Sequence, residues 1–173
     1  GMRNAPAGLL RVAAPSVFGR TFVAPVIPEF LSRYPRVRVD FSLVRQAEGS
    51  ESAVDAAIQL GAGSDQARDK GTRALGSFRQ VLCAAPEYLR RAGTPRSPEE
   101  LAQHDCILES SVADASAWRF RHDGHDIEQH IEGRLVCDDS EAVLNAALAG
   151  SGVARIPSFQ LREHVRTHKL EVL

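Results

Sequence analysis

The stretch "LRVAAPSVFGRTF", residues 10–22, decides the fold of this chain. Its first half is apolar and predicts a buried strand over residues 9–14. Its second half opens a helix, because apolar side chains recur at helical spacing over residues 18–34. Pro15 and Ser16 form the junction between the two. The proline fixes the backbone angle at the entry, and the serine hydroxyl can cap the helix or hold a ligand.

The segments that follow repeat this alternation of strand and helix. Pro25 and Pro28 predict a local irregularity in the first helix. Apolar and polar side chains alternate over residues 36–44 ("RVRVDFSLV"), which indicates a half-buried strand. A short helix at 50–55 and a strand at 56–61 ("AAIQLG") come next. Such alternation is typical of parallel βαβ units, so the sequence predicts an α/β fold.

The rest of the chain carries a second set of strands and helices. Ser97, Pro98 and Glu100 predict a capped helix start, and Asp123-Gly124 predicts a hairpin turn. The expected elements are two strands at 72–86 with a turn near Gly76-Ser77, helices at 86–93 and 97–105, a strand at 106–110, hairpin strands at 117–137, a helix at 138–152, a strand at 153–157, a helix at 158–168 and a strand at 169–173.

Composition and charge exclude several classes of function. Apolar residues make up 43% of the 173 residues, enough for a folded core, and 21 basic against 22 acidic residues argue against a polyanion as the main partner. No apolar run approaches the roughly 20 residues of a membrane span, so no membrane partner is expected. Cys83, Cys106 and Cys137 lie in separate strand-like segments without a CxxC neighbour. They predict reduced core cysteines in a cytoplasmic protein.

The sequence offers no catalytic, cofactor or metal site. It contains no GxSxG, no GxGxxG after a strand and no P-loop, so neither an enzyme activity nor a cofactor is predicted. His122, His125 and His130 cluster around the expected hairpin turn, but their spacing matches no defined set of metal ligands, and an exposed hairpin explains them. Asp138 and Asp139 directly precede a helix and are expected to cap it.

Ligand binding is better supported, because ligands of open α/β sheets bind at the carboxyl ends of the strands. Ser16 lies at such an end, where a helix start offers N–H groups to an anion. A plain helix cap is the alternative, and the sequence leaves both open. Arg45 is the side chain best suited to a two-point grip on a carboxylate, with an ordinary surface arginine as the alternative. The expected lining is Ser16, Val17, Phe18, Arg45, Gln46, Gln59, Gly61, Ser110, Ser111, Pro157 and Ser158.

Several long segments, in order along the chain, are similar to one known family. They are "LRVAAPSVFGRTFVAPVIPEFLSRYPRVRVDF" at 10–41, "LCAAPEYLRRAGTPRSPEELAQHDCIL" at 82–108, the W-x-F of Trp118 and Phe120, "EGRLVCDDSEAVLNAALAGSGVARIPSF" at 132–159 and "KLEVL" at 169–173. Together they resemble the effector-binding domain of LysR-type transcriptional regulators. The resemblance covers nearly the whole chain, from Gly8 to Leu173.

The resemblance implies a fold. Domains of this family look like periplasmic solute-binding proteins of type 2, with two α/β lobes and two inter-lobe crossovers. The crossovers are expected near 84–86 and 156–158. Lobe I would then comprise residues 8–84 with 159–173 returning to it, and lobe II residues 85–158. Family members continue past "KLEVL" with a further strand and helix, so lobe I is expected to be incomplete.

The resemblance also implies a function. Such a domain senses a small-molecule effector, here a polar metabolite or organic anion, in the cleft between its lobes. In the family the residue matching Ser16 often contacts the acid group of the effector. Gln59 stands where many relatives carry a basic residue, which leaves the charge of the effector open.

The implied partners follow from the same family. Its members form homodimers and bind DNA through an N-terminal winged helix-turn-helix, which this chain lacks, so DNA binding is expected only of the full-length protein. A homodimer is expected through the helices at 18–34 and 140–149. A stand-alone solute-binding protein of the same fold is the alternative, and no signal peptide supports it.

Overall fold

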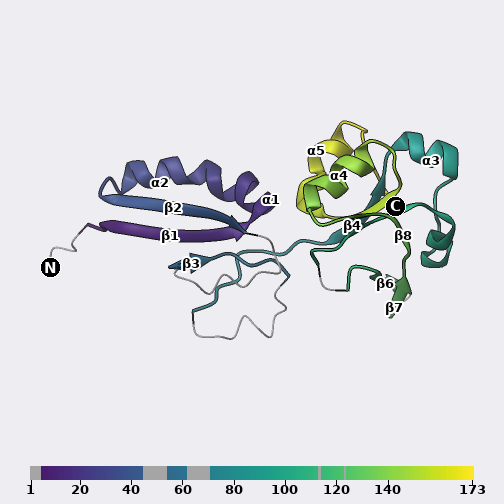
Figure 1. The fold of residues 1–173 in the computed structure, drawn as a ribbon, viewed down its shortest axis with the longest axis horizontal. Helices are drawn as coiled ribbons and strands as arrows, with labels where there is room; N and C mark the ends of the chain where they lie inside the picture. Colours follow the sequence, from purple (N-terminus) through teal and green to yellow (C-terminus); the bar gives the residue numbers. More distant parts are fainter. Residues whose placement is uncertain (1–4, 45–53, 62–70, 113, 123) are drawn as a thin grey trace. The chain divides into compact units, whose positions relative to one another are not determined.

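The computed structural model describes residues 5–44, 54–61, 71–112, 114–122 and 124–173 (Figure 1). Contacts divide the chain into unit 1, Gly1–Ala74, and unit 2, Leu75–Leu173. Each unit holds its own main sheet, so no single sheet runs through all the strands.

Unit 1 is built on a parallel sheet in the order β2-β1-β3. Its strands are β1 (Gly8–Pro15), β2 (Val37–Val44) and β3 (Ala56–Ala57). In this sheet Val12 lies opposite Phe41 on one side and Ala56 on the other. The parallel βαβ arrangement predicted for this part of the chain is confirmed. The helix predicted at 50–55 falls mainly on residues outside the described part.

The helix between β1 and β2 is irregular, as its prolines predict. It passes from α1 (Ser16–Phe18) through a π-helical turn, η1 (Gly19–Val23), and a 3₁₀ turn, η2 (Ala24–Val26), to α2 (Ile27–Arg33). A proline has no N–H to donate to the previous turn, so regular hydrogen bonding is interrupted there. Gly19 allows the helix to lie close to β2, because a Cβ at this position would come within 2.5 Å of Leu43 Cδ2.

Unit 2 is built on a mixed five-stranded sheet in the order β10-β4-β9-β5-β8. Strands β5, β8 and β9 run parallel to each other, whereas β4 is antiparallel to β9 and to β10. Its strands are β4 (Gln80–Ala84), β5 (Cys106–Glu109), β8 (Gly133–Cys137), β9 (Val153–Pro157) and β10 (Glu171–Val172). A separate hairpin is formed by β6 (Ala117–His122) and β7 (His125–His130). The helices are α3 (Pro86–Ala92), the 3₁₀ helix η4 (Pro98–Gln103), α4 (Ser140–Leu148) and α5 (Ser158–Arg166).

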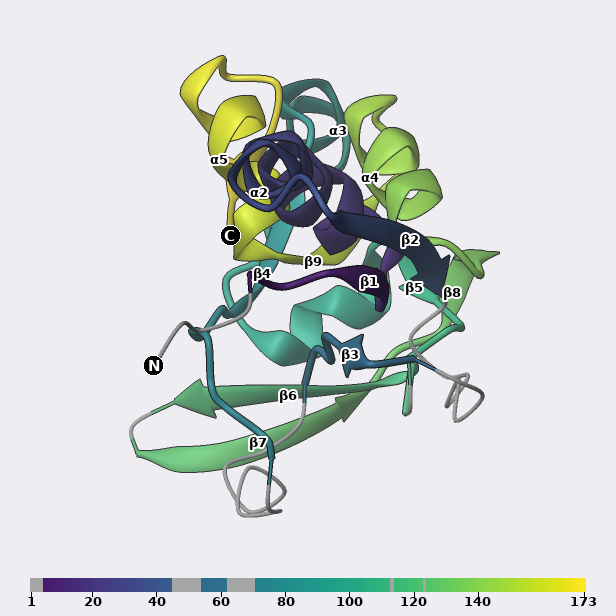
Figure 2. The same cartoon turned by 90° about the vertical axis from the view of Figure 1, so that its left-hand side faces the viewer.

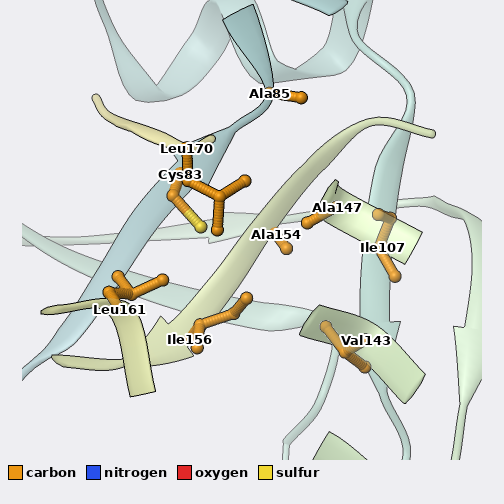
Figure 3. Close-up of a cluster of buried hydrophobic side chains, with 9 residues drawn as sticks. All are labelled: Cys83, Ala85, Ile107, Val143, Ala147, Ala154, Ile156, Leu161 and Leu170. Carbon is orange, nitrogen blue, oxygen red and sulfur yellow. The ribbon is translucent and has the colours of Figure 1, made fainter. Parts of the chain in front are cut away.

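Two apolar clusters cover the two faces of this sheet. Alternation along β9 sends Ala154 and Ile156 to the face covered by α4 and α5, where they meet Val143 and Leu161 (Figure 3). Val153 points to the opposite face, where the cluster includes side chains from α3, η4 and the β6–β7 hairpin. Figure 2 shows that hairpin and the pair α4 and α5 on opposite sides of β4 and β9.

Two local predictions for unit 2 are wrong. Residues 72–79 form no strand, and only Gln80–Ala84 pairs with neighbouring strands. Leu75 is 73% exposed, so its apolar side chain packs on no sheet. The Ser97 hydroxyl makes no capping hydrogen bond; instead the Glu100 carboxylate accepts one from the Arg96 N–H at 2.7 Å. The helix expected there is a 3₁₀ helix that begins at Pro98 as predicted.

The units also differ from the predicted lobe boundaries. Residues 75–84 and 159–173 were expected in lobe I, but they make their contacts within unit 2. The reason is strand pairing, since β4 pairs with β9 and with β10, and Leu161 and Leu170 share a core with Cys83.

Candidate ligand-binding edge of unit 2

Polar side chains gather where the parallel strands of unit 2 end. Because β5, β8 and β9 run in the same direction, their carboxyl ends lie along one edge of the sheet. We call this edge, residues 109–111, 138–140 and 157–160, the carboxyl edge. Ser110 is fixed to it by two hydrogen bonds to the Cys137 carbonyl, from its N–H at 2.7 Å and from its hydroxyl at 3.2 Å.

Glu109 is the central acidic group of the carboxyl edge. The Ser111 hydroxyl donates to its Oε1 at 2.7 Å, and the Ser140 hydroxyl also hydrogen-bonds to it. Burial raises the pKa of the Glu109 carboxyl, and the nearby carboxylate of Asp139 raises it further. The two serine hydroxyls and Arg155 counter this rise only in part. The edge therefore holds an acid whose charge is incompletely compensated.

Gln160, on α5, extends this network and leaves one atom unsatisfied. Its Nε2 donates to Ser140 Oγ at 2.7 Å, which links α5 to the start of α4. Its Oε1 is buried and has no hydrogen-bond partner among the described residues. A buried acceptor without a partner costs about 1–3 kcal/mol of folding free energy. A buried acceptor of this kind calls for an explanation, and a bound water, ion or ligand would supply the missing donor.

Asp139 closes the carboxyl edge at the start of α4. Its Oδ1 accepts hydrogen bonds from the N–H groups of Glu141 and Ala142, both at 3.0 Å. The carboxylate is therefore the side-chain cap of α4, as the sequence predicts.

The molecule contains two strand–Pro–Ser–helix junctions with nearly the same backbone. Pro15 has φ −56° and ψ 138°, and Pro157 has φ −56° and ψ 131°. In unit 2 the Ser158 N–H donates to the Arg79 carbonyl at 2.8 Å, and its hydroxyl accepts from the Arg79 N–H at 3.3 Å. In unit 1 the Ser16 hydroxyl makes, among the described residues, only a long bond of 3.5 Å to the Val44 carbonyl.

Neither serine caps its own helix, because the proline occupies the cap position at both junctions. The interpretation of Ser16 as a plain helix cap is therefore wrong. The interpretation of its hydroxyl as a ligand contact stays a prediction.

The predicted lining residues divide between the units. Ser16, Val17 and Phe18 follow β1, and the exposed Gln59 and Gly61 follow β3, which is parallel to β1. Ser110, Ser111, Pro157 and Ser158 lie on the carboxyl edge of unit 2. Arg45 and Gln46 lie outside the described residues.

Sequence reasoning missed Glu109, Arg155 and Gln160. It considered residues that follow strands, whereas Glu109 and Arg155 lie within strands and Gln160 lies in a helix. Arg155 is half-buried on β9, with its Cζ 5.6 Å from the centre of the Trp118 ring. A charged residue in the otherwise apolar strand "VARIP" was the available signal.

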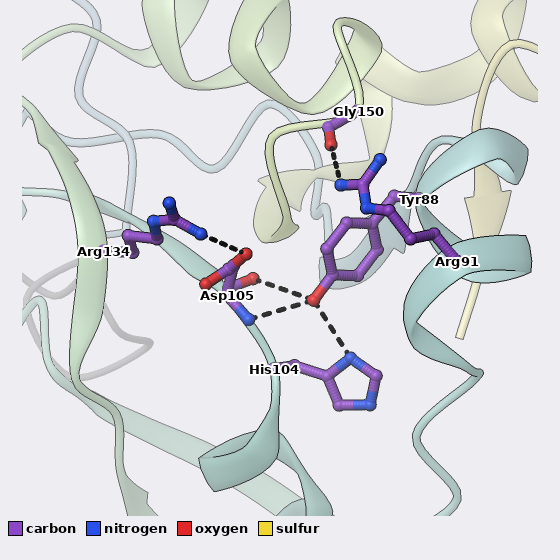
Figure 4. Close-up of polar contacts among 6 residues, drawn as sticks. All are labelled: Tyr88, Arg91, His104, Asp105, Arg134 and Gly150. Carbon is purple, nitrogen blue, oxygen red and sulfur yellow. Dashed lines mark hydrogen bonds and ion pairs between the residues drawn. The ribbon is translucent and has the colours of Figure 1, made fainter.

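The opposite edge of the same sheet, at the amino ends of β5, β8 and β9, carries two sets of polar contacts (Figure 4). We call this edge, residues 104–105, 133–134 and 150–152, the amino edge. The Tyr88 hydroxyl accepts from the Asp105 N–H at 2.9 Å and lies 3.0 Å from His104 Nδ1. Arg134 pairs with Asp105 at 2.9 Å, and Arg91 donates to the carbonyl of Gly150 at 3.2 Å. Burial foremost raises the pKa of Tyr88, so its hydroxyl stays protonated.

The cysteines offer no activated nucleophile. All three are free thiols, and Cys83 and Cys106 are buried. Burial raises the pKa of Cys83 to about 12 and that of Cys106 to about 11, so neither forms a thiolate near neutral pH.

Among the described residues, no group of three or more His, Cys, Asp or Glu side chains could hold a metal ion. In the same part of the chain, no helix is long and apolar enough to cross a bilayer.

Comparison with known proteins gives a consistent result. A family model described as the LysR substrate binding domain matches residues 3–173. The chain is 30% identical over 155 residues to the HTH-type transcriptional activator TtdR of Escherichia coli K12, covering 88% of this chain and 49% of that protein. It is 31% identical over 158 residues to the probable HTH-type transcriptional regulator LtrA of Klebsiella pneumoniae, covering 90% of this chain and 50% of that protein. The chain thus spans about half the length of these relatives.

Solved structures show the same similarity. The regulatory domain of CrgA, a LysR-type transcriptional regulator from Neisseria meningitidis, superposes with a TM-score of 0.78 at 26% identity, covering 97% of this chain and 81% of that domain. The full-length virulence activator AphB of Vibrio cholerae gives a TM-score of 0.83 at 23% identity, covering 98% of this chain and 57% of that protein, which supports the fold alone.

Proposed function

This chain belongs to the LysR substrate-binding domain family, and from that premise we propose that it senses a small-molecule effector for a transcriptional regulator. The single observation that carries the proposal is the family match over residues 3–173. The predicted fold class, α/β with the two-lobe, periplasmic-binding-protein-like architecture of the family, is confirmed. The relatives named above are transcriptional regulators, which favours sensing over transport by a stand-alone binding protein.

The effector contacts come from strand ends in each unit. In unit 1 they are Ser16, the neighbouring Val17 and Phe18, and the loop after β3 with Gln59 and Gly61. In unit 2 they are Ser110, Ser111, Pro157 and Ser158 on the carboxyl edge. Support comes from the hydroxyls of this edge and from the unsatisfied oxygen of Gln160, since ligand sites combine a few fixed polar groups with apolar walls. Arg45 and Gln46 complete the proposed lining.

The proposed partners of the whole protein are a second copy and DNA. Homodimers with self-complementary interfaces are the commonest assemblies of soluble proteins. DNA contact is assigned to the half of the regulator outside this chain, because a net charge of −1 gives this chain little attraction for phosphate. A cytoplasmic location fits both roles.

A thermal-shift screen tests the sensing function. The chain is heated with and without each member of a panel of small metabolites, organic acids included. A ligand present at 100 times its dissociation constant stabilises the folded state by about 2.7 kcal/mol, which raises the melting temperature by several degrees. At least one metabolite should give a saturable rise. Absence of stabilisation across acids, amines, sugars and aromatic metabolites would contradict an effector-sensing role.

A gel-shift assay and light scattering test the assignment of partners. The isolated chain should not retard operator DNA at physiological salt, whereas the full-length regulator should. Light scattering should show dimers at tens of micromolar, a concentration at which a micromolar interface is saturated. Sequence-specific DNA binding by the chain alone, or a strictly monomeric chain, would overturn the corresponding assignment.

A further inference from the structure

Arg155 is a half-buried cation held in a defined position. It lies on β9, two residues before Pro157, and its Cζ is 5.6 Å from the centre of the Trp118 ring. Trp118 is 1% exposed, and its Nε1–H donates to the Ala115 carbonyl at 3.2 Å, so the ring is fixed. An indole face attracts a guanidinium and therefore restrains where its N–H groups point.

The side-chain N–H donors of Arg155 have no acceptor in the part of the chain that the structure describes, where its guanidinium makes no hydrogen bond and no ion pair. Three other arginines of unit 2 have partners: Arg91 donates to Gly150, Arg134 pairs with Asp105, and Arg166 pairs with Glu163. All three are exposed and could be hydrated without a protein partner. The half-buried arginine is thus the one that most needs an acceptor and lacks it.

The surroundings of Arg155 are electrostatically unbalanced. Burial is the main cause that lowers the pKa of its guanidinium, and repulsion from Arg119 lowers it further. Attraction from Glu109 acts in the opposite direction and is weaker than the Arg119 repulsion. Attraction to an aromatic face supplies only part of what a guanidinium loses when it leaves water. A second negative group near Arg155 would compensate the positive charge of its guanidinium.

We propose that Arg155 binds the carboxylate of a small organic anion, with the guanidinium placed for this by the Trp118 ring. A guanidinium can meet a carboxylate with two parallel N–H···O bonds, which no other side chain offers in the same geometry. The proposal rests on the proposed effector-sensing function and names the chemical class of the effector. Arg155 would then make the bidentate contact with a carboxylate for which the sequence suggests Arg45.

The test follows the Nε–H resonance of Arg155 by NMR at constant pH and ionic strength. The probes are sodium acetate, succinate and benzoate, and each has its amide (acetamide, succinamide and benzamide) as an uncharged control of similar shape. At least one carboxylate should shift the resonance saturably, whereas its amide should bind at least tenfold more weakly. This titration uses the wild-type chain and does not depend on any variant folding.

Matched variants then separate Arg155 from charge in general. Arg155→Gln should raise the dissociation constant of that carboxylate at least tenfold, and Arg155→Lys, which keeps the charge but not the planar fork, should raise it less. Arg166→Gln removes the same charge from an exposed, paired position on α5 and should leave the dissociation constant of the carboxylate unchanged. Arg155→Lys also serves as the readout if the glutamine variant fails to fold.

Three results would overturn the inference: no saturable shift with any of the three carboxylates, equal shifts with an acid and its amide, or equal loss of affinity in Arg155→Gln and Arg166→Gln. The proposed function fails separately. If a metabolite stabilises the domain while Arg155 responds to no carboxylate, effector sensing stands and the role of Arg155 is refuted. If no metabolite stabilises the domain, the sensing function itself is refuted.

Discussion

Both edges of the unit 2 sheet carry polar side chains, but these side chains find partners to different degrees. At the amino edge, Tyr88, His104, Asp105 and Arg134 are linked in one chain of hydrogen bonds and an ion pair. At the carboxyl edge, the Gln160 oxygen lacks a partner and burial raises the pKa of Glu109. Connected polar networks stabilise a fold, whereas a buried group without a partner calls for an explanation such as a bound water, ion or ligand. This difference supports our proposal that a ligand binds at the carboxyl edge and not at the amino edge.

The largest expected effect comes from breaking the amino edge at Gly152. A Cβ at this position would collide with the backbone of Asp105, which cannot move away because it is hydrogen-bonded to Tyr88 and Val153. Gly152→Ala should lower the free energy of unfolding by about 3 kcal/mol. Urea denaturation measures it. Gly76→Ala, where a Cβ would meet nothing within 4 Å, is the control and should change stability by less than about 0.5 kcal/mol.

The second prediction removes one hydroxyl from the same edge. Tyr88→Phe leaves the Asp105 N–H without its acceptor, and it should cost about 1 kcal/mol because a partly buried donor is left unpaired. Effector binding should not change. A Tyr88→Phe chain as stable as wild type would mean that this edge is not held together by its network.

The third prediction concerns the carboxyl edge. Asp139→Ala removes the cap of α4 and should cost about 1 kcal/mol, measured by thermal or urea unfolding. Asp139→Asn should retain most of the stability, since the amide oxygen can accept from the same N–H groups. Equal losses in both variants would point to the charge of Asp139 rather than to its capping bonds.

The smallest effect is a dependence on pH. Because the folded-state pKa of Glu109 is raised above the ordinary glutamate value of 4.5, the folded state binds its proton more tightly than the unfolded state does. Its contribution to stability is then fully present below pH 4.5 and is lost as pH rises through the raised pKa. Glu109→Gln keeps an oxygen for the Ser111 hydroxyl and removes this titration. The urea midpoint of Glu109→Gln should rise relative to that of the wild type as the pH is raised from 4 to 7. If the midpoints of the two chains change in parallel with pH, Glu109 is excluded as the titrating group.

Local signals explain what could be predicted from the sequence. The β1–helix–β2 unit, the Asp139 cap, the helix stop at Gly93 and the hairpin at Gly124 each depend on neighbours a few residues apart. Glycine at Gly93 and Gly124 permits positive φ values of 86° and 78°, which the ends of a helix and of a strand pair require there. Residues 72–79 were mispredicted because a strand pattern without an available partner strand does not pair.

Contacts between distant segments explain what the sequence could not show. The bond between Gln160 and Ser140 joins residues 20 apart, and the placement of Arg155 over Trp118 depends on a hairpin packing against the sheet. Ser16 and Ser158 each follow a proline with nearly the same backbone angles, yet only Ser158 hydrogen-bonds to Arg79. The partners of a polar side chain, and hence its free capacity for a ligand, are set by tertiary structure.

We propose that the carboxyl edge, and not the amino edge, responds to an effector. Backbone amide NMR spectra recorded with increasing amounts of a metabolite that stabilises the chain test this directly. Within unit 2, the largest shifts should occur at Arg155 and at the carboxyl edge, residues 109–111, 138–140 and 157–160, with little change at 104–105, 133–134 and 150–152. Shifts concentrated at the amino edge, with the carboxyl edge unaffected, would contradict it.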